Sequence, residues 1–150
     1  MTPLIRILTM LAMIAGGACG GQSDGPPRIE VDRTSCAHCG MLISERGFAA
    51  AYRSPGSNAR VFDDIACLLE GVATEGDRSN TRFWFHDLAS SEWIEGAGAV
   101  FVHSARLRTP MAGGFVAYSD AAAAERGAVE HQGRVIRSLG DLFTEGPDGR

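Results

Sequence analysis

One short segment, CAHCGM at residues 36–41, constrains the fold of this chain more than any other. It brings two thiols, an imidazole and a thioether into six consecutive residues. A second segment, TPMAGG at residues 109–114, is similar in character, because it also places a methionine beside proline and glycine. Glycine and proline favour loops over regular elements, so we expect the rest of the chain to hold both segments open at the surface.

The N-terminus has the pattern of an export signal and not of a folded element. Arg6 is the one charged residue before a mostly apolar run over residues 7–15, which is shorter than the roughly 20 residues of a membrane-spanning helix. Cys19 directly follows the small residues at 16–18, as in the cleavage site of a bacterial lipoprotein. We therefore expect Cys19 to be lipidated after cleavage. The alternative is a plain signal peptide with an incidental cysteine.

The expected organisation is a signal peptide at residues 1–18, a lipidated flexible tether at 19–28, one domain at 29–145 and a tail at 146–150. The tether is polar and rich in glycine and proline. A chain of 150 residues suffices for one domain with a modest core. The formal charge is -4 and the fourteen basic residues are scattered arginines, so we expect no nucleic-acid binding.

The residue pattern of the domain predicts an α+β fold. Runs that alternate or are rich in aromatic residues predict strands, and Asp63 or Asp64, Asp120 and Ser138 are suitable N-caps for three helices. The expected strands cover residues 28–32, 47–52, 59–62, 82–86, 99–103, 115–119 and 134–137, the expected helices end near residues 70, 127 and 143, and residues 92–98 are expected to form a turn.

A faint internal repeat gives this fold a more specific form. Met41 and Met111 are each followed by a Gly-Phe pair, a tyrosine, an Asp-capped helix and a strand. This order predicts two small ββαβ-type halves packed as one domain, each presenting one methionine at the mouth of its first strand. The alternative is a chance recurrence of glycine, phenylalanine and tyrosine in a Gly-rich chain.

The Cys36-x-x-Cys39 spacing allows three kinds of site. A structural zinc site needs four ligands, and Cys67 is the one further cysteine in the domain. A thiol–disulfide enzyme of the thioredoxin type places its pair at the start of a helix, whereas this pair is expected in a loop before a strand. Cu(I) prefers soft thiolates and thioethers, so a small exposed set that includes Met41 and Met111 would suffice for this ion.

Three motifs together resemble the NosL family over nearly the whole mature chain: CxxCGM after a lipoprotein signal, FDDI at residues 62–65, and TPMxGG at residues 109–114. The resemblance implies a small lipoprotein that binds Cu(I) and supports copper-site assembly in nitrous oxide reductase. It also implies a fold of two ββα-type halves, similar to part of organomercurial lyase. By this resemblance Cys39, Met41 and Met111 are metal ligands. Cys36 assists them or pairs with Cys39 when no copper is bound.

His38 has three possible roles: it lowers the pKa of the neighbouring thiols, lends a nitrogen to the metal, or is an exposed loop histidine that does neither. Cys67 is expected to be a small buried hydrophobe, and Asp63 and Asp64 to be helix caps and not metal ligands.

The expected protein is therefore not an enzyme. It is a Cu(I) carrier, lipid-anchored on the periplasmic side of a bacterial membrane, that passes its ion by ligand exchange to a cuproenzyme or its assembly factors. The alternatives are an exported thiol–disulfide oxidoreductase and a small zinc-stabilised binding domain.

Overall fold

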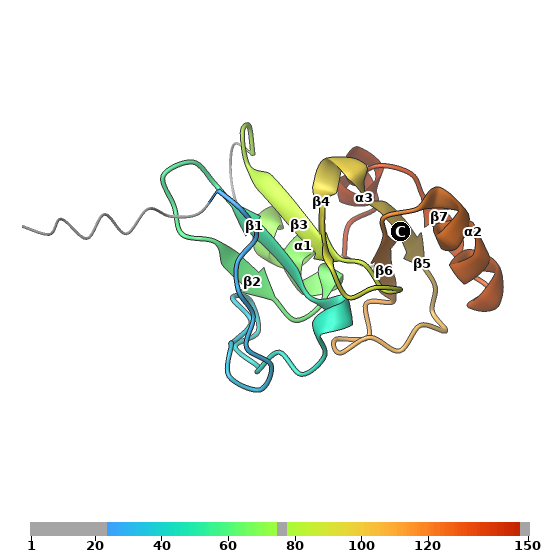
Figure 1. Cartoon of the computed structure of the whole chain (residues 1–150), viewed down its shortest axis with the longest axis horizontal. Helices are drawn as coiled ribbons and strands as arrows, with labels where there is room; N and C mark the ends of the chain where they lie inside the picture. The colour runs from blue at the N-terminus through green and yellow to red at the C-terminus, as the bar shows by residue number, and fades with distance from the viewer. Residues whose placement is uncertain (1–23, 75–77, 148–150) are drawn as a thin grey trace, which may run out of the picture.

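Two small antiparallel sheets organise the fold (Figure 1). The structure is a computed structural model that describes residues 24–74 and 78–147. The expected signal peptide, the expected lipidation site Cys19 and the end of the tail lie outside the described residues. The elements in chain order are η1 (Arg46–Phe48), β1 (Ala50–Arg53), β2 (Arg60–Phe62), α1 (Ile65–Ala73), β3 (Arg82–His86), β4 (Trp93–Glu95), η2 (Gly96–Gly98), β5 (Val100–His103), β6 (Phe115–Tyr118), α2 (Ala121–Glu130), β7 (Arg134–Ile136) and α3 (Leu139–Glu145).

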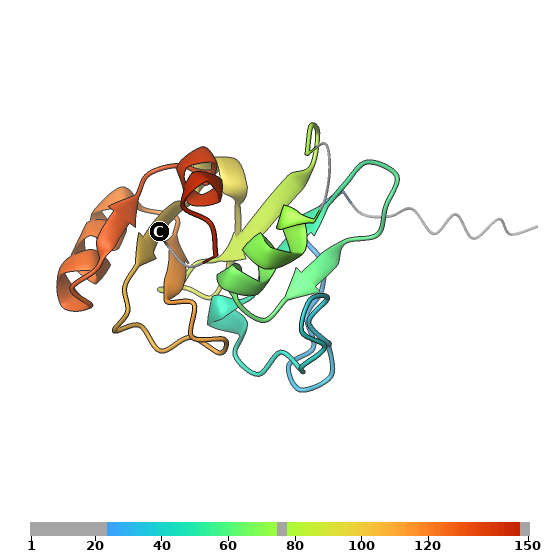
Figure 2. The same cartoon turned by 180° about the vertical axis from the view of Figure 1, so that it is seen from behind.

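The first sheet has the strand order β2-β1-β3-β4. Gly56, with a φ of +73°, lies in the turn that joins β1 to β2 and adopts a backbone conformation that favours glycine. Helix α1 begins after Asp64, whose carboxylate accepts a hydrogen bond from the N–H of Ala66 at 2.7 Å. The apolar stripe of this helix packs against one face of the sheet (Figure 2) and consists of Ile65, Leu68, Leu69 and Val72.

The second sheet has the strand order β6-β5-β7 and is covered by α2. Asp120 caps α2 by accepting from the N–H of Ala123 at 2.7 Å, and Ser138 caps α3. Gly127 lets α2 approach the sheet, because a Cβ at this position would lie 2.3 Å from the hydroxyl oxygen of Tyr118. Within the two described ranges, none of the helices combines the length and the apolar character that a membrane crossing requires.

The two halves of the chain share one topology, which confirms the prediction of two ββαβ-type halves. The first half runs β1-β2-α1-β3 and the second runs β5-β6-α2-β7, with the first strand of each half between the other two. The predicted place of the second methionine is wrong. Met41 does precede the first strand of its half, but Met111 lies between β5 and β6, ahead of a second strand. The Gly-Phe and Tyr pattern matches β1 with β6, which are not equivalent strands, so this pattern does not mark the repeat that the topology shows.

Three short segments differ from the prediction. The strand expected over residues 47–52 begins at Ala50, because residues 46–48 form the 3-10 helix η1. Residues 28–32 form an irregular stretch and a turn, and Ile29 buries its side chain in a small cluster with Ile43. Residues 93–95 form strand β4 where a turn was expected. Trp93 pairs with His86, and the resulting edge strand is too short for its alternation to stand out in the sequence.

Asp87, just after β3, joins the two sheets. Its backbone forms a parallel bridge with Ala117 of β6, and its buried carboxylate accepts a hydrogen bond from the N–H of Ser119 at 2.9 Å. Burial opposes ionisation, but the hydrogen bonds from Ser119 outweigh it and lower the pKa of Asp87. Phe85 and Phe101 meet edge to face at 4.8 Å, so one apolar core runs through both halves.

Candidate metal centre

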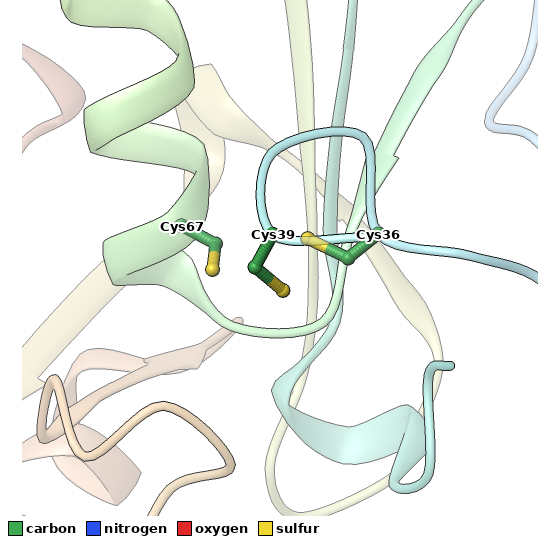
Figure 3. A group of neighbouring side chains, drawn as sticks. All are labelled: Cys36, Cys39 and Cys67. Atoms are coloured by element: carbon green, nitrogen blue, oxygen red, sulfur yellow. The ribbon is translucent and has the colours of Figure 1, made fainter. Parts of the chain in front are cut away.

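Three cysteine side chains from two segments meet between a loop and a helix (Figure 3). The sulfur atoms of Cys36, Cys39 and Cys67 all lie within 4.8 Å of one another. Cys36 and Cys39 come from the loop that carries the Cys-x-x-Cys motif, and Cys67 comes from the first turn of α1. All three are free thiols. Cys36 and Cys67 are buried and Cys39 is partly exposed, so Cys39 is the member of the cluster that solvent reaches.

Cys67 is the member that the sequence prediction assigned to the core alone. It is buried, as predicted, but its sulfur faces the other two cysteines and not only apolar side chains. One signal in the sequence points to this position. Cys67 is the one cysteine of the domain outside the Cys-x-x-Cys motif, and it is the third residue of a helix whose aspartate cap is recognisable.

The loop around Cys36 and Cys39 is closed by its own backbone. The N–H of Cys36 donates to the carbonyl of Met41 at 2.7 Å, and the N–H of Gly40 donates to the carbonyl of Cys36 at 3.0 Å. Gly40 has a φ of +77°, which a residue with a side chain rarely adopts. The N–H of Ala37 donates to the carbonyl of Val61 at 2.7 Å, so the loop is fastened along the exposed edge of β2.

The surroundings of the three thiols differ in their effect on ionisation. Burial raises the pKa of Cys36, but backbone N–H groups, including those of Asp63 and Cys39, donate to its sulfur, and the net pKa lies below the ordinary value. Burial strongly raises the pKa of Cys67, and the nearby sulfurs of Cys36 and Cys39 raise it further. In the absence of metal, Cys36 therefore ionises before Cys67.

His38 is engaged by a partner outside the cysteine cluster. Its Nε2 lies 2.7 Å from a carboxylate oxygen of Glu70 on α1, and both side chains are substantially exposed. This contact ties the cysteine loop to the same helix that carries Cys67. Nε2 of His38 therefore contacts this carboxylate and not the cysteine cluster.

The two methionines of the domain are both exposed at the surface. Met41 is 55% exposed and Met111 is 37% exposed, which is unusual for large apolar side chains in a folded domain. Met41 follows the cysteine loop directly. The N–H of Met111 donates to a carboxylate oxygen of Asp64 at 3.1 Å, so the loop of residues 104–114 contacts the start of α1, three residues before Cys67.

A shallow pocket lies beside Met111. It is lined by α1 residues Ala66 and Glu70, by His103 of β5, and by residues 111–113 of the loop. The pocket gives Met111 a solvent-filled space on one side, while Ala66 belongs to the helix that carries Cys67. Helix α1 therefore borders both the cysteine cluster, through Cys67, and the pocket beside Met111, through Ala66 and Glu70.

Asp64 caps a helix, as the sequence predicted, whereas the carboxylate of Asp63 instead accepts a hydrogen bond from a loop. Asp64 is the N-cap of α1. Asp63 is buried and accepts a hydrogen bond from the N–H of Ser44 at 3.3 Å, and burial with the nearby charges of Asp64 and Glu45 raises its pKa. Its backbone N–H donates to the sulfur of Cys36, so the turn before α1 also shapes the cluster.

Comparisons with known proteins give a consistent result. The family model NosL matches residues 28–142 of the chain. The structure is similar to the crystal structure of the copper chaperone NosL from Shewanella denitrificans, with a TM-score of 0.67 and 19% sequence identity over 75% of this chain and 92% of that chain. At this identity the likeness shows a shared fold. The comparison with curated proteins finds no match.

Proposed function

Because the chain belongs to the NosL family, we propose that it is a metallochaperone that binds Cu(I) at the three-cysteine cluster and releases it by ligand exchange. The observation that carries the proposal is the convergence of three sulfur atoms within 4.8 Å of one another. Thiolates are soft donors and suit Cu(I), whereas carboxylates and carbonyls suit harder ions. The solved relative named above is described as a copper chaperone, which supports the same cargo.

The size of the cluster fits a single ion. For three atoms that lie within 4.8 Å of one another there is always a point no more than about 2.8 Å from any of them, against roughly 2.3 Å for a zinc–thiolate bond. A small inward movement of the side chains would therefore bring all three sulfurs to bonding distance. Binding replaces thiol protons, so the raised pKa of Cys67 makes binding at that sulfur more dependent on pH than binding at Cys36.

We assign the ligands in two groups. Cys36, Cys39 and Cys67 form the inner part, in which the two buried thiols shield one side of the ion from water and Cys39 borders solvent. Met41 and Met111 form an exposed part, and their neutral thioethers offer weaker bonds through which the ion leaves. His38 contacts Glu70 through Nε2, so it stays a lesser candidate that acts mainly by tying the loop to α1.

The proposed place of action is the periplasmic side of a bacterial membrane, with Cys19 as the lipidated anchor. Residues 1–18 have the composition of an export signal, and the polar stretch after Cys19 is suited to a tether. The proposed acceptor is an exported cuproenzyme or its assembly factors, and the family suggests nitrous oxide reductase. Transfer needs no covalent step, because incoming thiolate or imidazole donors replace the bound sulfurs one at a time.

A Cu(I) titration against a competing chromophoric chelator tests the proposal. We expect one Cu(I) per chain and a large loss of affinity in Cys39→Ser. A zinc-stabilised domain would instead unfold on chelation of Zn(II). A thiol–disulfide enzyme would keep its activity in Met41→Leu and Met111→Leu and lose it in Cys36→Ser. Failure of the wild-type chain to compete with the chelator for Cu(I) would contradict the proposal.

A further inference from the structure

The two carboxylate oxygens of Asp64 have different partners. Oδ1 accepts from the N–H of Ala66 at 2.7 Å and caps α1, while Oδ2 accepts from the N–H of Met111 at 3.1 Å. The residue is 0% exposed. One buried carboxylate therefore joins the helix that carries Cys67 to the loop that carries Met111, although the two partners lie in different halves of the chain.

The same loop makes a second close contact at this helix end. A Cβ added to Gly113 would lie 2.2 Å from the Cβ of Ala66 and 3.2 Å from a carboxylate oxygen of Asp64. The absence of a side chain at residue 113 is therefore what lets the loop reach α1. Met111 itself is 37% exposed, so packing in the core does not fix its thioether. The backbone contacts of residues 111 and 113 fix the loop instead.

From this geometry we propose that Asp64 is a positioning residue of the metal site. By holding the backbone of Met111 at the start of α1, it keeps the Met111 thioether within reach of an ion bound by the cysteines. This inference rests on the proposed Cu(I) function and adds to it a residue that does not touch the ion. The effects of Asp64 and Met111 on Cu(I) affinity are therefore coupled. Loss of the Oδ2 acceptor should remove the contribution of Met111 to Cu(I) binding and leave the contributions of the other ligands unchanged.

Asp64→Asn is the variant that separates the capping of α1 from the hydrogen bond to the N–H of Met111. Asparagine is as good an N-cap as aspartate, but its amide group offers one acceptor oxygen in place of two. The NH2 group of the asparagine side chain then faces one of the two backbone N–H donors, Ala66 or Met111, and that donor loses its acceptor. Asp64→Ser keeps a capping oxygen on a shorter side chain and serves as a second variant. Asp120→Asn is the matched control, because Asp120 caps α2 in the other half through the N–H of Ala123.

The coupling is measured by a double-mutant cycle on the full chain, with Cu(I) affinity determined by chelator competition and folding checked by urea denaturation. We expect Asp64→Asn to lower the affinity about tenfold, the loss expected when one weak thioether ligand no longer reaches the ion. Met111→Leu should give a similar loss, and the double variant should bind no more weakly than Met111→Leu alone. Asp120→Asn should bind as the wild type does. Losses that multiply in the double variant, or wild-type affinity in Asp64→Asn, would overturn the proposal.

A second readout follows the thioether itself. With ¹³C-labelled methionine methyl groups, assigned by Met41→Leu and Met111→Leu, Cu(I) should shift both signals in the wild type and only the Met41 signal in Asp64→Asn. If that variant does not fold, Gly113→Ala displaces the same loop with Asp64 intact and should give the same pattern. A retained Met111 shift in whichever variant folds would overturn the proposal.

These results also separate the two proposals. A wild-type chain that does not bind Cu(I) overturns the proposed function and this inference with it. Tight wild-type binding together with unchanged binding in Asp64→Asn, or in Gly113→Ala if Asp64→Asn does not fold, overturns only the positioning role of Asp64.

Discussion

Replacement of Cys67 by alanine is the most direct test of a site made from three cysteines. The sulfur of Cys67 lies within 4.8 Å of those of Cys36 and Cys39, on a helix that is otherwise part of the core. Four-ligand zinc sites contribute about 10–16 kcal/mol, or roughly 3 kcal/mol for each ligand. If Cys67 contributes a similar amount, its loss should weaken Cu(I) binding about 100-fold.

The variant should still fold. Cys67 is buried, and removal of one sulfur atom from the core costs about 1 kcal/mol, which is small beside the 5–15 kcal/mol of an ordinary domain. Val72→Ala is the control, because it removes more volume than Cys67→Ala does from the buried face of the same helix without touching a sulfur. Val72→Ala should lose at least as much stability as Cys67→Ala and keep the wild-type affinity for Cu(I).

The assay is a competition titration of Cu(I) between the protein and a chromophoric chelator, with urea denaturation of each metal-free variant alongside. The expected result is a large loss of affinity in Cys67→Ala alone. If Cys67→Ala binds Cu(I) as tightly as the wild type, the buried thiol is only a core residue and the three-cysteine site is wrong. If Val72→Ala loses as much affinity, the effect comes from general loosening of the helix.

Three further outcomes follow from the charges of the molecule. Burial raises the pKa of Cys67 above 9.0, so the folded metal-free chain keeps a proton that the unfolded chain loses at high pH. Urea titrations should therefore show the unfolding free energy falling as pH rises above about 9. Cys67→Ala should show a flatter pH profile. Asp87→Asn should cost about 2–3 kcal/mol in unfolding free energy. The unfolding free energy of the wild type should fall as pH drops through the lowered pKa of Asp87, and the same acid titration of the variant should not show this loss. Glu70→Gln should change Cu(I) affinity less than about threefold, because its pair with His38 is exposed, and a much larger loss in His38→Gln would identify the imidazole as a ligand.

Local chemistry made much of the fold predictable from the sequence. Asp64, Asp120 and Ser138 were recognisable as N-caps because a short polar side chain before an apolar helical stripe has few other uses. Strands with several aromatic or β-branched residues were recognisable for a similar reason, whereas β4 was too short to show a pattern.

Contacts between distant segments were not predictable in the same way. Cys67 has the burial expected of a core residue, and only the path of the cysteine loop along β2 brings two other sulfurs to it. Asp87 likewise follows a strand with no local motif, yet its carboxylate joins the two sheets. A single sequence shows which residues carry chemistry, but the meeting of two such residues depends on how separate elements pack.

The shared topology of the halves explains why the site is not itself duplicated. Both helices start with an aspartate cap, but the third residue is Cys67 in α1 and Ala123 in α2. The connection between the first and second strands also differs, since it covers residues 54–59 in the first half and 104–114 in the second. The longer connection is the one that crosses to the other half, where Asp64 holds Met111. The repeated fold therefore supplies two similar frames, and the candidate site depends on the places where those frames differ and on the cysteine loop that precedes the first frame.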